Sequence, residues 1–129
     1  MLITRESEYA MRMIRALADY EVMTVRKICD NEHVPFNFAY KILKKMERAN
    51  IVKAYCGANG GYQLDKELSK ITMLDILTIN KNNLHRNYGV NNLNNTKSAE
   101  CTISNELRRL ENTIRFELRE RTMDKVIRV

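Results

Sequence analysis

The sequence predicts a mainly α fold with one small β-hairpin. Apolar residues recur at helical spacing in the first part of the chain and again after residue 99. Between these regions, the stretch YCGANGGYQL holds three of the four glycines and follows a β-branched segment. With 129 residues, 44% hydrophobic and 29% charged, the composition is that of a soluble globular protein. No apolar run is long enough to span a bilayer, so we expect a cytoplasmic protein.

Three helices are predicted before the glycine-rich stretch. The first is amphipathic and is expected over about Glu6 to Tyr20. Thr24 can act as the N-cap of a short second helix that ends near Asn31, because its hydroxyl can accept a hydrogen bond from a free amide of the first turn. A third helix is expected after Pro35, to about Ala49. Its predicted buried face consists of Phe38, Ala39, Ile42, Leu43 and Met46.

A β-hairpin is predicted after the third helix. IVKAYC suits a strand, Gly57, Gly60 and Gly61 make the bend, and Tyr62 begins the return strand. A phosphate-cradling loop would place the glycines between a strand and a helix, usually with Lys-Ser or Lys-Thr after them, and that pattern is missing here. Two helices joined by a short turn and followed by a hairpin predict a winged helix-turn-helix.

The distribution of charge predicts double-stranded DNA as the partner. The net charge is +6 and the pI is about 9.3. From Phe36 to Cys56, five basic residues stand against one acid, Glu47. Residues near the start of a recognition helix reach base edges, so Asn37, Tyr40 and Lys41 are predicted to contact bases. Contacts to the DNA backbone or by the wing are predicted for Lys44, Lys45, Arg48, Lys53, Cys56, Asn59, Gly60, Gly61 and Tyr62.

The region after the hairpin is predicted to contain three further helices. Thr72 and Asp75 form a capping box for a helix that ends near Asn80 and closes a DNA-binding domain of residues 1–80. Residues 81–98 are rich in asparagine and lack periodicity, which predicts a loop. Residues 99–129 are expected to form a long helix, on which arginine and glutamate alternate, and a short terminal helix capped by Thr122. The long helix has a stripe of Ile103, Leu107, Leu110, Ile114 and Leu118, which needs a partner surface.

Several of these segments resemble the Rrf-two family of bacterial winged helix-turn-helix regulators. The resemblance rests on Tyr9-Ala10, FAYKILKKMERANIVK, GANGGYQL and KELSKITMLDIL, and it covers residues 1 to 80 best. It implies a homodimeric regulator, which we expect to be a repressor, on a near-palindromic operator. The stripe on the long helix would then be the dimer interface. The resemblance also implies an arginine in the wing, and this chain has Cys56 at that position instead.

The signal to which such a regulator responds is less determined by the sequence. In cluster-binding members of the family, three closely spaced cysteines lie before the dimer helix and an acidic residue on the first helix assists them. Here only Cys101 and Glu8 match, so no cofactor or metal is predicted, and the response is to a partner protein, a small molecule or thiol oxidation. Cys29 is expected in the core. Cys56, near basic residues, and Cys101, in the first turn of its helix, are the thiols whose surroundings favour thiolate.

Two alternatives to this function stay open at the sequence level. One is an iron-sulfur-sensing regulator of the same family, which would use Glu8, Cys101 and borrowed ligands. The other is a protein-interaction module that does not bind DNA. An enzyme is not predicted, because His33 and His85 have no nucleophile or carboxylate arranged around them. His33 is instead expected to fill the turn of the helix-turn-helix, where a positive φ is useful.

Overall fold

The computed structural model describes residues 3–80 and 98–128, with the side chains of residues 98–101 excepted. Three helices, α1 (Arg5–Ala16), α2 (Val25–Glu32) and α3 (Phe36–Arg48), precede an antiparallel hairpin of β1 (Val52–Tyr55) and β2 (Gly61–Leu64). A 3₁₀ turn, η1 (Leu68–Lys70), leads to α4 (Met73–Asn80). The long helix α5 (Ser98–Glu120) and the short helix α6 (Met123–Ile127) complete the fold. The predicted fold class, a winged helix-turn-helix with a long C-terminal helix, is confirmed.

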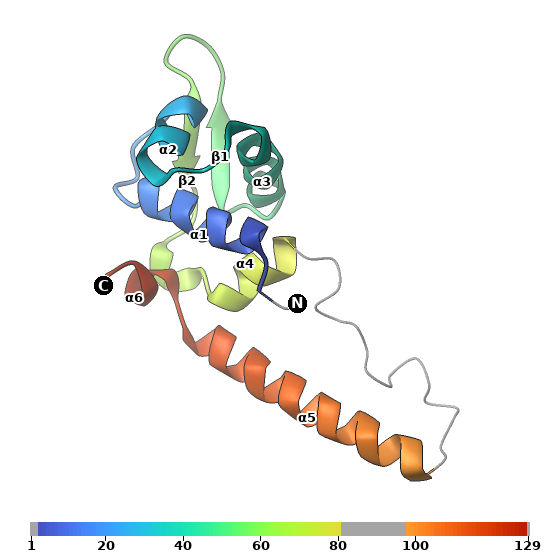
Figure 1. Ribbon diagram of the computed structural model, residues 1–129. Helices are drawn as coiled ribbons and strands as arrows, with labels where there is room; N and C mark the ends of the chain where they lie inside the picture. Colours follow the sequence, from blue (N-terminus) through green and yellow to red (C-terminus); the bar gives the residue numbers. More distant parts are fainter. Residues whose placement is uncertain (1–2, 81–97, 129) are drawn as a thin grey trace.

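The core lies among α1, α2, α3 and the hairpin, with α4 and α6 packed beneath them (Figure 1). α1 is central to this arrangement because it contacts α2, α3 and α4. Figure 1 shows α5 leaving this body as a single extended helix. None of the helices in the described ranges is long and apolar enough to cross a membrane. The largest fully buried side chains include Met13, Ile14, Ile42, Leu43, Met46 and Ile76.

Most local predictions are confirmed, and four differ from the structure. α1 ends at Ala16, four residues earlier than predicted, and the chain then turns with Tyr20 at a φ of 61°. Phe38 is exposed and its ring packs beside Tyr9, with centroids 6.1 Å apart, instead of entering the core. β2 begins at Gly61, one residue before Tyr62. Thr122 is the N-cap residue of α6 but makes no side-chain cap bond, because its hydroxyl binds Asp124.

Backbone hydrogen bonds attach the end of α5 to the start of α4. The Met73 amide donates to the Arg121 carbonyl at 2.9 Å, and the Met123 amide donates to the Ile71 carbonyl at 2.8 Å. The predicted capping box is present beside them, since Thr72 Oγ1 accepts from the Asp75 amide at 3.1 Å and the Thr72 amide donates to the Asp75 carboxylate at 3.0 Å. These bonds fix the direction in which α5 leaves the body. The predicted loop of residues 81–98 lies outside the described residues except for Ser98, which begins α5.

Candidate nucleic-acid interface

The recognition helix α3 is oriented by the short turn that joins it to α2. The residues of this turn favour the backbone conformations that it needs. Thr24 begins α2 as predicted, accepting a hydrogen bond from the Lys27 amide at 3.3 Å. α2 ends at Glu32 and is followed by the C-cap residue His33, whose φ of 55° and ψ of 43° are left-handed, as expected for this position. Val34 is buried, and Pro35 at the N-cap supplies the extended backbone from which α3 starts. Because of this turn, the first residues of α3 have one face exposed to solvent.

The exposed face of α3 carries the residues predicted to contact DNA. Asn37, Tyr40, Lys41 and Lys44 are exposed, while Ala39, Ile42 and Leu43 between them are buried. Phe36, which sequence reasoning missed, is half-exposed and forms an edge-on pair with Tyr40, with ring centroids 5.3 Å apart. The sequence does give a signal for it, because Phe36 is apolar but does not lie at the helical spacing of the buried residues. α3 therefore begins with two adjacent aromatic rings on its solvent face.

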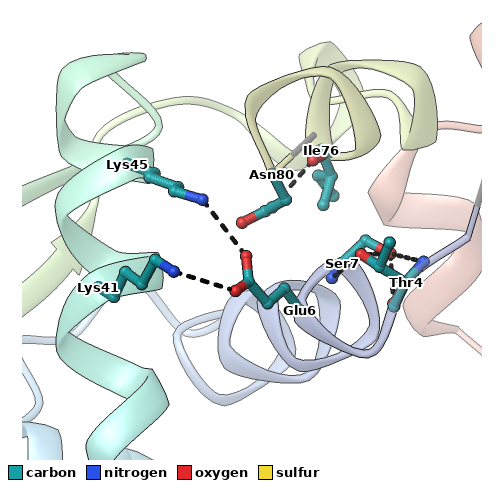
Figure 2. A network of polar contacts seen from close by, with 7 residues as sticks. All are labelled: Thr4, Glu6, Ser7, Lys41, Lys45, Ile76 and Asn80. Carbon is teal, nitrogen blue, oxygen red and sulfur yellow. Dashed lines mark hydrogen bonds and ion pairs between the residues drawn. The ribbon is translucent and has the colours of Figure 1, made fainter. Parts of the chain in front are cut away.

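Two lysines of α3 are bound by an acid from α1, which sequence reasoning also missed. Glu6 Oε1 lies 3.4 Å from Lys41 Nζ, and Glu6 Oε2 lies 3.3 Å from Lys45 Nζ (Figure 2). Burial alone would raise the pKa of Glu6, but hydrogen bonds and attraction from Lys45 and Lys41 outweigh it and lower that pKa below its ordinary value. Sequence spacing gives no signal for this contact, because the partners are 35 and 39 residues apart.

The wing is held close to the body through its return strand. β1 and β2 pair from Val52 with Leu64 to Tyr55 with Gly61. The Tyr62 amide donates to the Met23 carbonyl at 2.8 Å, and the Met23 amide donates to the Tyr62 carbonyl at 2.9 Å. The Tyr62 side chain is buried in the core, so this predicted wing residue offers little surface to DNA. Its position directly after the glycines did not show whether the Tyr62 ring faces the core or the solvent.

Close backbone contacts explain why two of the wing residues are glycines. A Cβ on Gly61 would lie 2.3 Å from the Met23 carbonyl oxygen, and a Cβ on Gly60 would lie 2.4 Å from the Tyr55 carbonyl oxygen. Gly57 has a φ of +99° and open space around it. At the tip, Cys56 and Asn59 are exposed, as their predicted role requires. The tip extends beyond α2 and α3 in Figure 1.

The other predicted phosphate contacts lie along α3 and β1. Arg48 is exposed at the end of α3. Lys53 is half-exposed on β1, 3.7 Å from an Asp65 carboxylate oxygen and 5.8 Å from the centre of the Tyr55 ring. Within the described ranges, Lys44 and Arg48 form no ion pair. The structure thus separates basic residues that are free to meet an anion from those that already have a partner.

The long helix α5 leaves most of its apolar stripe uncovered. Ile103, Leu107, Leu110 and Ile114 are exposed, Leu110 to 59%. Leu118 differs from the prediction, since it is only 7% exposed and packs against Leu77 of the same chain. The charged residues pair along the helix as predicted, in Glu106–Arg109, Glu111–Arg115 and Glu117–Arg121. Phe116, also exposed, lies two residues from Ile114 and hence on another face.

Comparison with known families decides the relationship of the chain. A family model named Rrf2 and described as iron-dependent transcriptional regulator matches residues 3–129. The chain belongs to the Rrf2 family. The resemblance to the Rrf-two family is thereby confirmed, and the members of this family are transcriptional regulators, not enzymes.

Two curated relatives match more than half of this Rrf2 chain. A protein of Synechocystis described as an HTH-type transcriptional regulator is 35% identical over 80 residues, and the Rhizobium meliloti protein aau3 is 31% identical over 81 residues. The matches cover 60% and 61% of this chain. They span about half of the length of the relatives, 54% and 53%.

Solved structures share the whole fold at low sequence identity. IscR of T. potens has a TM-score of 0.74 at 17% identity and covers 97% of this chain and 85% of its own. CymR of B. subtilis, the global cysteine regulator, has a TM-score of 0.74 at 20% identity, covering 97% and 95%. The oxidized form of Staphylococcus aureus CymR has a TM-score of 0.72 at 17% identity, covering 100% and 98%. At these identities the likeness shows the fold alone.

The family description names iron, but the described donor residues of this Rrf2 chain do not fit an iron-sulfur centre. Cluster iron needs several thiolates, whereas Cys29 is buried in the core and Cys56 lies on the wing. Burial, with the charge of Asp30, raises the pKa of the Cys29 thiol. Glu8 is engaged by Arg12 at 2.5 Å. Among the described residues, no three His, Cys, Asp or Glu side chains gather as a metal site, and the Cys101 side chain lies outside them.

Proposed function

We propose that this protein is a homodimeric, sequence-specific DNA-binding transcriptional repressor that binds a near-palindromic operator. The observation that carries the proposal is the solvent face of α3, where polar and aromatic side chains come first and free basic side chains follow. That order matches the general division of labour on a recognition helix, in which its first residues reach base edges and later cations meet phosphates. The wing beside α3 extends the same surface.

Each exposed residue of α3 suits a particular part of the duplex. Asn37 can make paired hydrogen bonds with adenine, and Lys41 can donate to guanine. Tyr40, together with Phe36, offers aromatic surface to a thymine methyl group. Lys44 and Arg48 lie further along the helix, where the phosphates of the groove edge are expected.

The uncovered stripe of α5 supports the homodimer. Four large apolar side chains, Ile103, Leu107, Leu110 and Ile114, recur on one face of a helix that stands away from the body. Exposed apolar surface of this regularity favours association with a matching helix. A second copy would provide that helix and would place two recognition helices on one duplex, which is the arrangement that reads a palindrome.

We further propose that the regulatory signal reaches the protein without a bound iron-sulfur cluster, through a partner protein, a small molecule or thiol oxidation. The thiol alternative is supported by Cys56, which is free and exposed on the wing. It is also supported by a structural neighbour, S. aureus CymR, whose structure is that of an oxidized form. Oxidation of a wing thiol would add a polar group directly at the DNA surface.

Salt dependence of duplex binding tests the proposed function. Log affinity should fall linearly with log salt, by about 0.9 for each phosphate neutralised. Replacing Lys44 by Ala should reduce that slope by about one for each protomer, whereas Lys70→Ala should leave it unchanged, because η1 packs on α6, away from the wing. A flat salt dependence, or no duplex binding at low salt, would favour the protein-interaction module.

The wing has a separate test. Cys56→Arg restores the residue that the family resemblance implies and should tighten binding to duplexes with a narrow, A·T-rich minor groove. Cys56→Ser is the matched control, since it removes the thiol without adding charge. Equal affinities of the two variants would show that the wing of this protein does not contact the groove.

A further inference from the structure

Glu6 holds together the first turn of α1 and the basic face of the recognition helix. Its two carboxylate oxygens each meet a different lysine, Lys41 at 3.4 Å and Lys45 at 3.3 Å (Figure 2). The two lysines are four residues apart on α3 and therefore lie on the same side of that helix. Both were predicted to touch DNA. The Glu6 carboxylate and the phosphates of DNA therefore compete for the same two ammonium groups.

The two contacts differ in how easily DNA can break them. Lys41 is 62% exposed, whereas the side chains of Lys45 and Glu6 are 27% and 25% exposed. Asn80, at the end of α4, points toward the pair in Figure 2, and within the described residues its Oδ1 has no hydrogen-bond partner although the residue is only 7% exposed. With both of its side chains mostly covered, the Lys45–Glu6 contact is less open to a phosphate than the Lys41–Glu6 contact.

Moving Lys45 to a phosphate has a cost that a free lysine does not have. It leaves the mostly covered Glu6 carboxylate without that partner, next to the negative charge of DNA. Lys44, the residue before Lys45 on α3, has no ion pair within the described ranges and can meet a phosphate without such a loss. Adjacent lysines of identical chemistry therefore differ in their availability to DNA.

Resting on the proposed function, we propose that Glu6 is a specificity-determining residue of the DNA interface. By holding Lys45, and in part Lys41, it withholds positive charge from the phosphates that every duplex offers. Non-operator DNA, which has only phosphates to attract the protein, is weakened most. Operator DNA keeps the base contacts of α3 that do not involve Lys45, so the ratio of operator to non-operator affinity rises.

A salt series on a fluorescein-labelled, mixed-sequence duplex tests the proposal with the full-length protein. Glu6→Gln keeps the shape of the side chain and removes its charge. It should tighten non-operator binding about threefold to tenfold for each protomer, the range expected for releasing two partly exposed ion pairs. It should also steepen the slope of log affinity against log salt by about one to two for each protomer, as the freed lysines displace counterions.

Three controls separate this mechanism from a simple change in net charge. Glu106→Gln removes the same charge from an ion pair with Arg109 on α5, far along the chain from α3, and should change the slope little. Glu6→Asp keeps the net charge but shortens the reach, so its slope should fall between those of the wild type and Glu6→Gln. In the wild-type background, Lys45→Met should leave the slope nearly unchanged, and in the Glu6→Gln background it should lower the slope. Lys44→Met should lower the slope in both backgrounds.

The outcomes distinguish failure of this inference from failure of the proposed function. Duplex binding with equal slopes for Glu6→Gln and Glu106→Gln, or a wild-type slope that falls equally for Lys45→Met and Lys44→Met, overturns the inference and leaves DNA binding intact. No salt-dependent duplex binding by the wild type or by any variant overturns both. Circular dichroism reports whether each variant is folded, and if Glu6→Gln is not, the slope of Glu6→Asp decides.

Discussion

Gly61→Ala should destabilise the protein more than Gly57→Ala, because the wing strand touches the body through its backbone at Gly61. The new Cβ would lie 2.3 Å from the Met23 carbonyl oxygen and 2.6 Å from the Met23 carbonyl carbon. Neither atom belongs to a flexible side chain, so the strand itself must move. The movement separates the two hydrogen bonds between Met23 and Tyr62, of 2.8 and 2.9 Å.

The magnitude follows from these two effects. A φ of +150° is rare for a residue with a side chain, and holding alanine there costs on the order of 1 to 3 kcal/mol. Weakening two backbone hydrogen bonds adds about 0.5 to 1.5 kcal/mol each. Because the strand can relieve strain only by giving up hydrogen bonds, the two costs overlap, and we expect a total of about 2 to 4 kcal/mol in the free energy of unfolding.

Urea denaturation measures this loss, from the shift in midpoint at constant slope. Gly57→Ala is the matched control, because Gly57 also has a positive φ, +99°, but no atom within 4 Å of the added Cβ. It should lose about 1 kcal/mol, from backbone strain alone. If Gly61→Ala costs no more than Gly57→Ala, the close approach of the wing to Met23 does not exist in the protein.

Further expectations concern the long helix, the cysteines and Glu6. Leu110→Asp should convert the proposed dimer to a monomer in analytical ultracentrifugation without lowering monomer stability. Leu118→Ala, which opens the contact with α4, should cost about 2 to 4 kcal/mol in urea melts. Iodoacetamide should label Cys56 rapidly and buried Cys29 only on unfolding, as read by peptide mass spectrometry; equal rates would contradict the burial. Folding lowers the pKa of Glu6 below its ordinary value of 4.5. The stabilising effect of Glu6 relative to Glu6→Gln should therefore be complete above pH 4.5 and be lost as the pH falls through the lower pKa of the folded state. Thermal melts of the two proteins across this pH range measure the difference.

The sequence was sufficient for the architecture because each element has a local cause. Thr24 and the Thr72–Asp75 pair begin helices through bonds to the adjacent turn, and such caps can be read from residues three apart. The glycine cluster locates the wing for a similar reason. Boundaries without a local stop signal were not predictable. α1 ends at Ala16 although apolar spacing continues to Ala18, because the chain must turn there to bring Met23 to its isolated β-bridge with Tyr62.

The candidate interface was predictable only where exposure follows from helical spacing. Asn37, Tyr40 and Lys41 lie on the polar side of α3, and the structure leaves them exposed. Tyr62 and Leu118 were assigned to surfaces and are buried, because their partners come from distant segments, the body beneath the wing and Leu77. Glu6 was missed for the same reason. Alternation within one segment says which face a residue occupies, but not which other segment covers that face.

Glu6 also changes how the charge of this interface should be counted. Along the chain, five basic residues and Glu47 give the segment from Phe36 to Cys56 a net charge of +4, and the contact with α1 brings in one more acid, which lowers it to +3. The wing tip, where the resemblance implies an arginine, has the neutral Cys56 instead. Both differences reduce the part of the binding energy that every phosphate backbone can provide. Base contacts by the first turns of α3 must then supply a larger share of operator affinity, so discrimination between sequences should depend more on Asn37 and Tyr40 than on the total number of lysines.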